Sequence, residues 1–202
     1  MPGQWLKLLM RLNDHDVYLT GGEVFLFQGI TDILEGLFRY TRIYTNAMLI
    51  TDRLLGRVIP DRVMFRCSYH PSSGPIERFV ESIKLLKSRG ISYQIYMVDV
   101  PENDVLKFQI DYFRNKKYEL GIDYDQRRHV CKKGKVGCNL STIIVSPDGT
   151  PFHCVSHMLR NKNVGRNLIE MGDEIPRPST VVCDEPQACA PCDLAAASQE
   201  ER

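Results

Sequence analysis

Long apolar runs are missing from this sequence: no segment of its 202 residues approaches the roughly 20 apolar residues needed to span a bilayer. The apolar segment 5–10 is short and interrupted by Lys7, which is not the layout of a signal peptide. Charge of one sign is not in excess either, because the formal net charge is +1. That balance gives no electrostatic case for nucleic acid or an anionic membrane as a partner. The sequence therefore predicts a cytoplasmic protein.

A simple disulfide framework is also excluded. The chain has seven cysteines, an odd number, and six of them follow residue 130. In a reducing compartment, clustered thiolates favour a metal site over disulfides. The remaining composition, 43% hydrophobic and 25% charged, is ordinary for a globular protein. A chain of this length can bury one or two cores.

The first part of the chain, residues 1–118, alternates between strand and helix patterns. Short apolar strands are predicted at 17–19, 43–44, 63–65 and 95–98, and helical spacing follows at 30–37, 76–86 and 106–113. Strands that recur with helices between them predict βα units and a parallel sheet. The chain begins with a helical pattern at 5–12, so we expect that a strand which would precede it has been lost.

Polar residues and glycines stand at the carboxyl ends of these strands, where sheets of this class bind ligands. They are Gly21, Gly22, Glu23, Asn46, Ser68 and Asp99. Two glycines after a strand allow a backbone to approach a ligand, and a carboxylate can hold an ammonium group. Taken alone, the tripeptide 21–23 is more often an ordinary strand-to-loop turn.

The alternation of strand and helix patterns ends at residue 118, and we expect a second domain over 119–202. A polar, basic loop is predicted at 123–137, and a β-hairpin at 143–154 around Pro147-Asp148-Gly149. Cys138 and Cys154 are separated by ten residues, Gly149 and four residues, and Cys189-Ala-Pro-Cys192 follows. Together with Cys183, thiolates clustered in this way predict a metal site.

Several segments together resemble the radical SAM enzymes. The stretch 16–27 with Thr-Gly-Gly-Glu resembles their second strand and Gly-Gly-Glu-Pro motif, with Val24 in place of the proline. Thr45-Asn46-Ala47 is similar to their Thr-Asn-Gly segment, and Ser68 to the fourth-strand position that contacts the cofactor. The resemblance implies a partial (β/α) barrel that binds S-adenosylmethionine (AdoMet). Gly21, Gly22 and Glu23 would then hold the amino group of its methionine part.

The family's Cys-x3-Cys-x2-Cys loop, which holds the catalytic [4Fe–4S] cluster, does not occur in this sequence. Catalytic residues are therefore not assigned. We expect a truncated chain, a gene fragment, or a split protein whose cluster-bearing half or subunit is another polypeptide. In an intact enzyme, the resemblance implies reductive cleavage of AdoMet and hydrogen abstraction from a substrate, with a peptide or protein as the expected class.

The cysteine-rich part resembles the SPASM and twitch extensions of that family, which hold auxiliary iron–sulfur clusters. The resemblance implies one auxiliary [4Fe–4S] cluster on Cys138, Cys154, Cys189 and Cys192, with Cys131 and Cys183 in reserve. The same thiolates would accept a structural zinc, for which His157 offers a nitrogen ligand. The competing hypothesis is thus a non-catalytic zinc- or iron–sulfur-binding fragment or subunit.

Overall fold

The computed structural model describes residues 2–12, 15–37, 39–70, 74–99, 104–124, 136–139, 143–153, 157–158, 161–171 and 180–183. The chain divides into two compact units, Met1–Tyr124 and Asp125–Arg202. The boundary between the two units lies after residue 124. The sequence pattern predicted it after residue 118.

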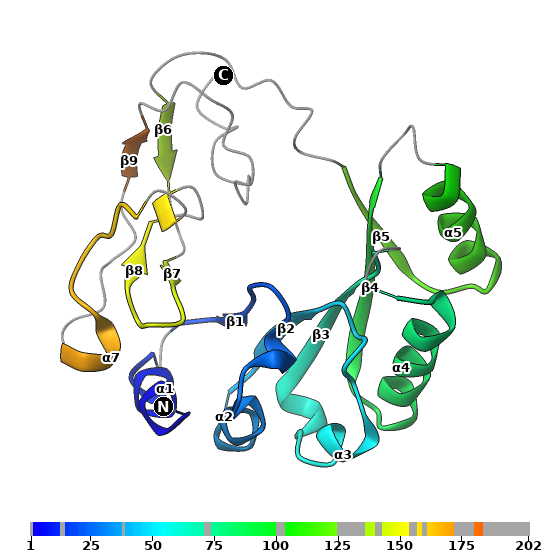
Figure 1. Cartoon of the computed structure of the whole chain (residues 1–202), viewed down its shortest axis with the longest axis horizontal. Helices are drawn as coiled ribbons and strands as arrows, with labels where there is room; N and C mark the ends of the chain where they lie inside the picture. Colours follow the sequence, from blue (N-terminus) through cyan, green and yellow to red (C-terminus); the bar gives the residue numbers. More distant parts are fainter. Residues whose placement is uncertain are drawn as a thin grey trace. The chain divides into compact units, whose positions relative to one another are not determined.

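A five-stranded parallel sheet forms the centre of the first unit (Figure 1). Its strands are β1 (Val17–Leu19), β2 (Thr41–Thr45), β3 (Val63–Ser68), β4 (Ser92–Asp99) and β5 (Leu120–Tyr124). The spatial order equals the chain order, and each strand pairs in parallel with the next. The four strands predicted from apolar runs are confirmed. The fifth was not predicted, because its glycine and aspartate lower strand propensity.

Helices connect the strands, and the predicted helical segments are confirmed. They are α1 (Pro2–Arg11), α2 (Ile30–Gly36), α3 (Asp52–Leu55), α4 (Ile76–Ser88) and α5 (Asp104–Asn115), with short 3-10 turns η1 (Val24–Leu26) and η2 (Pro60–Arg62). In α4, Phe79, Val80, Ile83 and Leu86 form the buried face. The residue that caps its start is Pro75, without a side-chain hydrogen bond.

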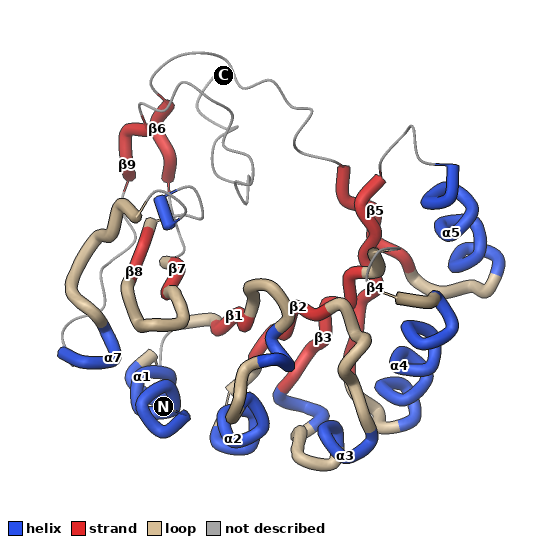
Figure 2. The backbone as a smooth tube through the Cα atoms, in the orientation of Figure 1, coloured by secondary structure: helices blue, strands red, loops and turns tan. Residues whose placement is uncertain are grey.

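All five helices lie on one side of the sheet (Figure 2). This follows from the strand order: right-handed crossovers that always step to the next strand place each helix on the same face. A doubly wound sheet, in contrast, reverses its order at a switch point and carries helices on both faces. The one-sided arrangement is that of a (β/α) barrel wall, and it supports a partial barrel of five strands.

The two faces of the sheet differ in burial. Along β2 and β3, buried residues alternate strictly with half-buried ones. The buried set packs under the helices and includes Ile43, Phe65 and Cys67, each with no exposed surface. The half-buried set carries Arg42, Tyr44 and Arg66 on the opposite face. A period of two thus separates a core face from a polar face.

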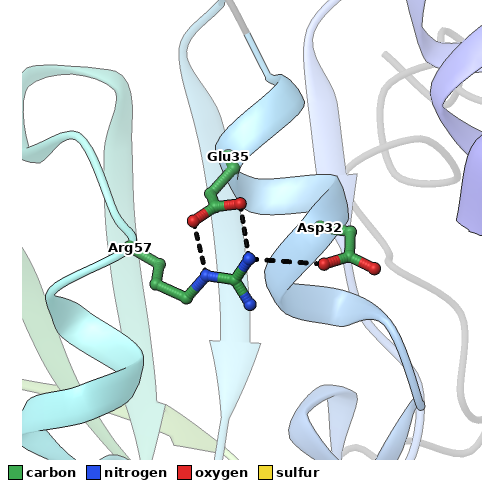
Figure 3. A network of polar contacts seen from close by, with 3 residues as sticks. All are labelled: Asp32, Glu35 and Arg57. Carbon is green, nitrogen blue, oxygen red and sulfur yellow. Dashed lines mark hydrogen bonds and ion pairs between the residues drawn. The ribbon is translucent and has the colours of Figure 1, made fainter.

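Arg57, which follows α3, links this connection to α2 (Figure 3). Its Nε and Nη2 donate to the two carboxylate oxygens of Glu35, with Nη2 at 2.6 Å from Oε2. Nη2 also lies 3.5 Å from Oδ1 of Asp32. The hydrogen bond from Arg57 is the main cause that lowers the pKa of Glu35. Desolvation opposes this lowering, and the arginine's charge adds to it.

We expect Arg57→Gln to destabilise the protein slightly at neutral pH and still less in acid. A carboxylate with a lowered folded-state pKa binds fewer protons than in the unfolded chain. The contribution of Glu35 to folding stability is therefore complete above its ordinary pKa of 4.5. It is lost as the pH falls through the lowered pKa of the folded state. Exposure and salt screening keep the effect small. Urea midpoints of wild type and variant should converge on acidification, while divergence would contradict this assignment. Arg53→Gln serves as the control.

The second unit contains two small antiparallel pairs. Strand β6 (Val136–Asn139) pairs with β9 (Thr180–Cys183), and β7 (Ile144–Val145) pairs with β8 (Pro151–Phe152). The helix α7 spans Leu168–Met171. The β7–β8 pair lies within the segment 143–154 that was predicted as a hairpin, with a positive φ of 92° at Gly149 in its turn, while Cys154 lies outside the described residues. The ends of the predicted 123–137 loop belong instead to β5 and β6.

None of the helices in the described ranges combines the length and apolar character that crossing a bilayer requires.

Candidate functional site

The predicted site residues of the first unit meet at the carboxyl edge of the sheet. Parallel strands bring their carboxyl ends to one edge. Gly21, Gly22 and Glu23 follow β1, Asn46 follows β2, and Ser68 is the last residue of β3. The β2–β3 register pairs Thr45 with Cys67, so Asn46 and Ser68 follow at the same level on neighbouring strands.

The Glu23 carboxylate ties the loop after β1 to the end of β2. Its Oε1 accepts hydrogen bonds from the Thr45 hydroxyl at 2.8 Å and from the Phe25 backbone N–H at 3.2 Å. Its Oε2 accepts from the Asn46 backbone N–H at 2.8 Å. The sequence predicted a ligand-binding role for Glu23 and missed this structural one, because the contacts depend on the register of β1 and β2.

The same carboxylate keeps one position for a further donor. A carboxylate has about four lone-pair sites, and donors from the described residues use three of them. The remaining site is on Oε2. An ammonium group that donates there would form a charge-assisted hydrogen bond to a carboxylate already fixed in position. The geometry is therefore compatible with the predicted amino-group contact.

The glycines before Glu23 leave open space beside the backbone. Gly21 has a φ of 145°, in the region that glycine adopts without strain. A Cβ placed at Gly21 or at Gly22 would meet no atom within 4 Å. A ligand could therefore lie directly against this backbone, as the two glycines suggested in the sequence.

The turn after β2 is locked by local hydrogen bonds. The Asn46 Oδ1 accepts from the Met48 N–H and the Thr45 hydroxyl accepts from the Ala47 N–H, both at 2.9 Å. Ala47 is fully buried and has a φ of 62°. This left-handed conformation strains a non-glycine residue by about 1 kcal/mol. The Asn46 side-chain NH2 makes no hydrogen bond to a described residue, so it can donate to a ligand.

Ser68 stands beside this turn at the end of β3. Its side chain is half-buried, and its hydroxyl makes no hydrogen bond within the described part of the chain. A hydroxyl can both donate and accept. Together, Glu23, Asn46 and Ser68 thus offer an acceptor, a donor and a hydroxyl at one edge.

Cys67 lies beneath this edge and is fully buried. Burial, followed by the nearby charge of Glu23, raises the pKa of its thiol far above the ordinary value of 9.0. Because the thiolate is the reactive form, the folded protein should keep this thiol inert at neutral and mildly alkaline pH. Cys67 is therefore a core side chain and no ligand.

We expect Cys67 to remain unmodified by iodoacetamide in the folded protein and to react once urea unfolds it. Peptide mass spectrometry after timed labelling would follow the residue separately from the other cysteines. The expected ratio of rates is at least about a hundredfold, since both the thiolate fraction and access are reduced. Labelling of Cys67 at similar rates with and without urea would contradict the buried assignment.

The structure separates Cys138 from the predicted hairpin. Cys138 lies on β6, which pairs with β9, so it does not stand on an arm of the β7–β8 hairpin as expected. The local spacing suggested a single hairpin, whereas β6 finds its partner some forty residues later in the chain. Cys183, held in reserve, is the last residue of β9, opposite Val136.

The other predicted metal ligands, Cys154, Cys189 and Cys192, lie outside the described residues, as does Cys131. Within the described ranges, no three His, Cys, Asp or Glu side chains gather as a metal site. The four-cysteine set thus stays a prediction.

A hollow of about 630 Å3 lies at the opposite, amino-terminal edge of the sheet, far from the site residues along the strands. Four lysines border it at the carboxyl ends of α4 and α5, where cations offset the helix dipoles. Its residues are Ile83, Lys84, Lys87, Ile91, Ser92, Tyr93, Lys116, Lys117, Tyr118 and Glu119. Because this helix-dipole arrangement explains the lysines, we place the candidate site at the carboxyl edge.

No protein-family model and no curated protein matches the chain. Two solved structures of anSMEcpe are similar to it. "Native anSMEcpe with bound AdoMet and Kp18Cys peptide" has a TM-score of 0.59 and 15% identity over 83% of this chain and 69% of that chain. A histidine-tagged form of anSMEcpe with bound AdoMet has a TM-score of 0.62 and 14% identity over 83% of this chain and 65% of that chain.

This chain therefore spans about two thirds of the length of those chains. At such identity the likeness is one of fold. The first unit has the parallel sheet with helices on one face that a partial barrel requires.

Proposed function

We propose that this chain binds AdoMet at the carboxyl edge of its parallel sheet. Glu23 would accept a hydrogen bond from the cofactor's amino group beside Gly21 and Gly22, and Asn46 and Ser68 would contact its polar atoms. The observation that carries the proposal is the fixed Glu23 carboxylate, which keeps one acceptor site free beside an open glycine backbone. The structural neighbours support the choice of ligand, since both were solved with AdoMet bound.

We further propose that the second unit holds an auxiliary [4Fe–4S] cluster on Cys138, Cys154, Cys189 and Cys192. Four thiolates are the usual ligands of such a cluster. When bound, the cluster would supply electron-transfer chemistry, while the chain supplies thiolates and their spacing. Zinc on the same thiolates is the alternative.

A peptide or protein is the proposed substrate class, with modification through AdoMet as the proposed activity. One neighbour was solved with a bound Kp18Cys peptide, which supports this class. A second candidate function is a non-catalytic metal-binding fragment or subunit that works beside a cluster-bearing half.

Equilibrium dialysis with radiolabelled AdoMet tests the cofactor proposal. We expect about one AdoMet bound per chain, with S-adenosylhomocysteine as competitor and Arg53→Gln as a control that leaves binding unchanged. Arg53 is exposed on α3, away from the carboxyl edge. An absence of binding at millimolar AdoMet would contradict the proposal.

Metal analysis tests the second unit. After anaerobic reconstitution, we expect about four irons and four sulfides per chain, lost in Cys189→Ala/Cys192→Ala. Cys67→Ala is the matched control, because that buried thiol is not a proposed ligand. Stoichiometric zinc without sulfide would contradict the cluster and favour the structural alternative.

A further inference from the structure

Arginines and tyrosines alternate along the sheet face that lies opposite the helices. The strand register places five of them on this face: Tyr18, Arg42, Tyr44, Arg66 and Tyr96. No described helix of the first unit covers it, because α1–α5 all lie on the other side (Figure 2). Along β2 and β3, Arg42, Tyr44 and Arg66 alternate with buried residues.

Arg66 is held between two aromatic rings. Its guanidinium carbon lies 4.9 Å from the centre of the Tyr44 ring and 4.0 Å from that of Tyr96. Its Nη1 donates a hydrogen bond to the Tyr44 hydroxyl at 2.6 Å. Stacking of this kind holds the planar guanidinium group of Arg66 in place and leaves one of its N–H edges available to bind a carboxylate. Arg66 is also two residues before Ser68 on β3, and so lies next to the proposed AdoMet edge.

Arg42 repeats this arrangement one strand away. Its guanidinium carbon lies 5.0 Å from the centre of the Tyr18 ring, and its Nη1 donates to the Tyr18 hydroxyl. The two arginines stand on adjacent strands, offset by two residues. Each is therefore backed by a tyrosine from the preceding strand, and the face presents two ordered cations.

Neither cation has an acidic partner among the described residues. Arg57, Arg78, Arg89 and Arg114 each pair with an aspartate or glutamate, whereas no such pair joins Arg42 or Arg66. Two like charges on one half-buried face repel each other, and a bound carboxylate would offset the repulsion. The face is therefore complementary to an anion.

We infer that this face recognises an acidic peptide segment, whose carboxylate side chains pair with Arg66 and Arg42. Arginine and tyrosine are enriched in surfaces that bind peptides and proteins, where the rings supply contact area and the fork supplies direction. The inference extends the proposed function, because it names the substrate class that would be presented to the AdoMet edge.

Two fluorescein-labelled peptides, capped at both ends, test the inference by fluorescence anisotropy. One carries glutamates spaced by glycine and serine, and the other has glutamine at the same positions. We expect wild type to bind the glutamate peptide about tenfold more tightly, which corresponds to a charge-assisted hydrogen bond. The preference should fall about tenfold in Arg66→Met, partly return in Arg66→Lys, and shrink in high salt.

Arg53→Met is the matched control, since it removes the same charge from an exposed helix position. Near-ultraviolet circular dichroism of each variant reports whether the tyrosine packing is kept. Equal affinity for the two peptides, no binding of either, or a preference that survives Arg66→Met/Arg42→Met would overturn the inference. AdoMet dialysis on the same samples separates the two proposals. If the protein binds AdoMet but does not prefer the glutamate peptide, only this inference is overturned. If it prefers the glutamate peptide through Arg66 but does not bind AdoMet, only the AdoMet proposal is overturned.

Discussion

Glu23→Ala is expected to lower AdoMet affinity at least about tenfold and the free energy of unfolding by about 2 kcal/mol. The binding loss follows from removal of the carboxylate that would accept from the cofactor's amino group, since hydrogen bonds to charged groups contribute about 1.5–3 kcal/mol. The stability loss follows from the Thr45 hydroxyl and the Asn46 N–H, which lose their acceptor. Dialysis measures the first effect and urea unfolding the second.

Glu23→Gln separates the two effects. Its amide oxygen keeps the shape and one acceptor, so stability should fall less than in Glu23→Ala, while AdoMet affinity should fall by a similar factor because the charge is gone. Glu119→Ala, at the opposite edge of the sheet, is the matched control and should change neither quantity. An AdoMet affinity in both Glu23 variants equal to that of wild type would assign Glu23 a purely structural role.

Phe113→Ala is expected to destabilise the first unit by about 3–5 kcal/mol, the range for truncating a buried phenylalanine. Phe113 has no exposed surface. Its ring packs edge-on against four other rings at centroid distances of 5.5–6.1 Å, those of Tyr69, Phe79, Tyr112 and Tyr118. This cluster joins α4, α5 and the end of β3. Its loss should therefore weaken the packing of these helices against the sheet that carries the site. The shift of the urea midpoint measures the effect.

Phe108→Ala on the same helix provides the control. Phe108 is 73% exposed, so the substitution removes the same atoms and changes helix propensity equally, without opening a cavity. We expect a change of less than about 0.5 kcal/mol. Similar losses in the two variants would show that the aromatic cluster is not the core of this unit.

The fold of the first unit was largely predictable because its strands are short apolar runs and its helices carry apolar stripes. Strand β5 was missed for a reason visible in the packing. A Cβ at Gly121 would lie 2.7 Å from the Tyr96 ring, so the packing requires the residue that weakens the strand pattern. Local propensity and tertiary packing thus point in opposite directions at this position.

Pairings between distant segments were beyond local patterns. Strands β6 and β9 join residues 136–139 to 180–183, so the place of Cys138 could not be read from its spacing to Cys154. In the site, the glycines and the strand ends indicated where a ligand could bind. The bonds of Glu23 to Thr45 and Asn46 depend on the register of neighbouring strands, which the sequence does not specify.

The functional interest of the polar face could not be inferred from the alternation of polar and apolar residues in the sequence. Arg42, Tyr44 and Arg66 occupy alternate positions of β2 and β3, as expected for any sheet with one face outside the core. Only the ring distances and the lack of acidic partners among the described residues distinguish this face from an ordinary solvated one.

Hydrogen–deuterium exchange with and without AdoMet tests whether AdoMet binds at the carboxyl edge of the sheet, because it locates the ligand on the chain. We expect slower exchange in peptides covering 20–27, 44–48 and 66–70, at the carboxyl edge of the sheet. Peptides covering 84–93 and 116–119, which border the hollow at the other edge, should exchange as before. Protection at the amino-terminal edge, or exchange unchanged by saturating AdoMet, would contradict the assignment of this site.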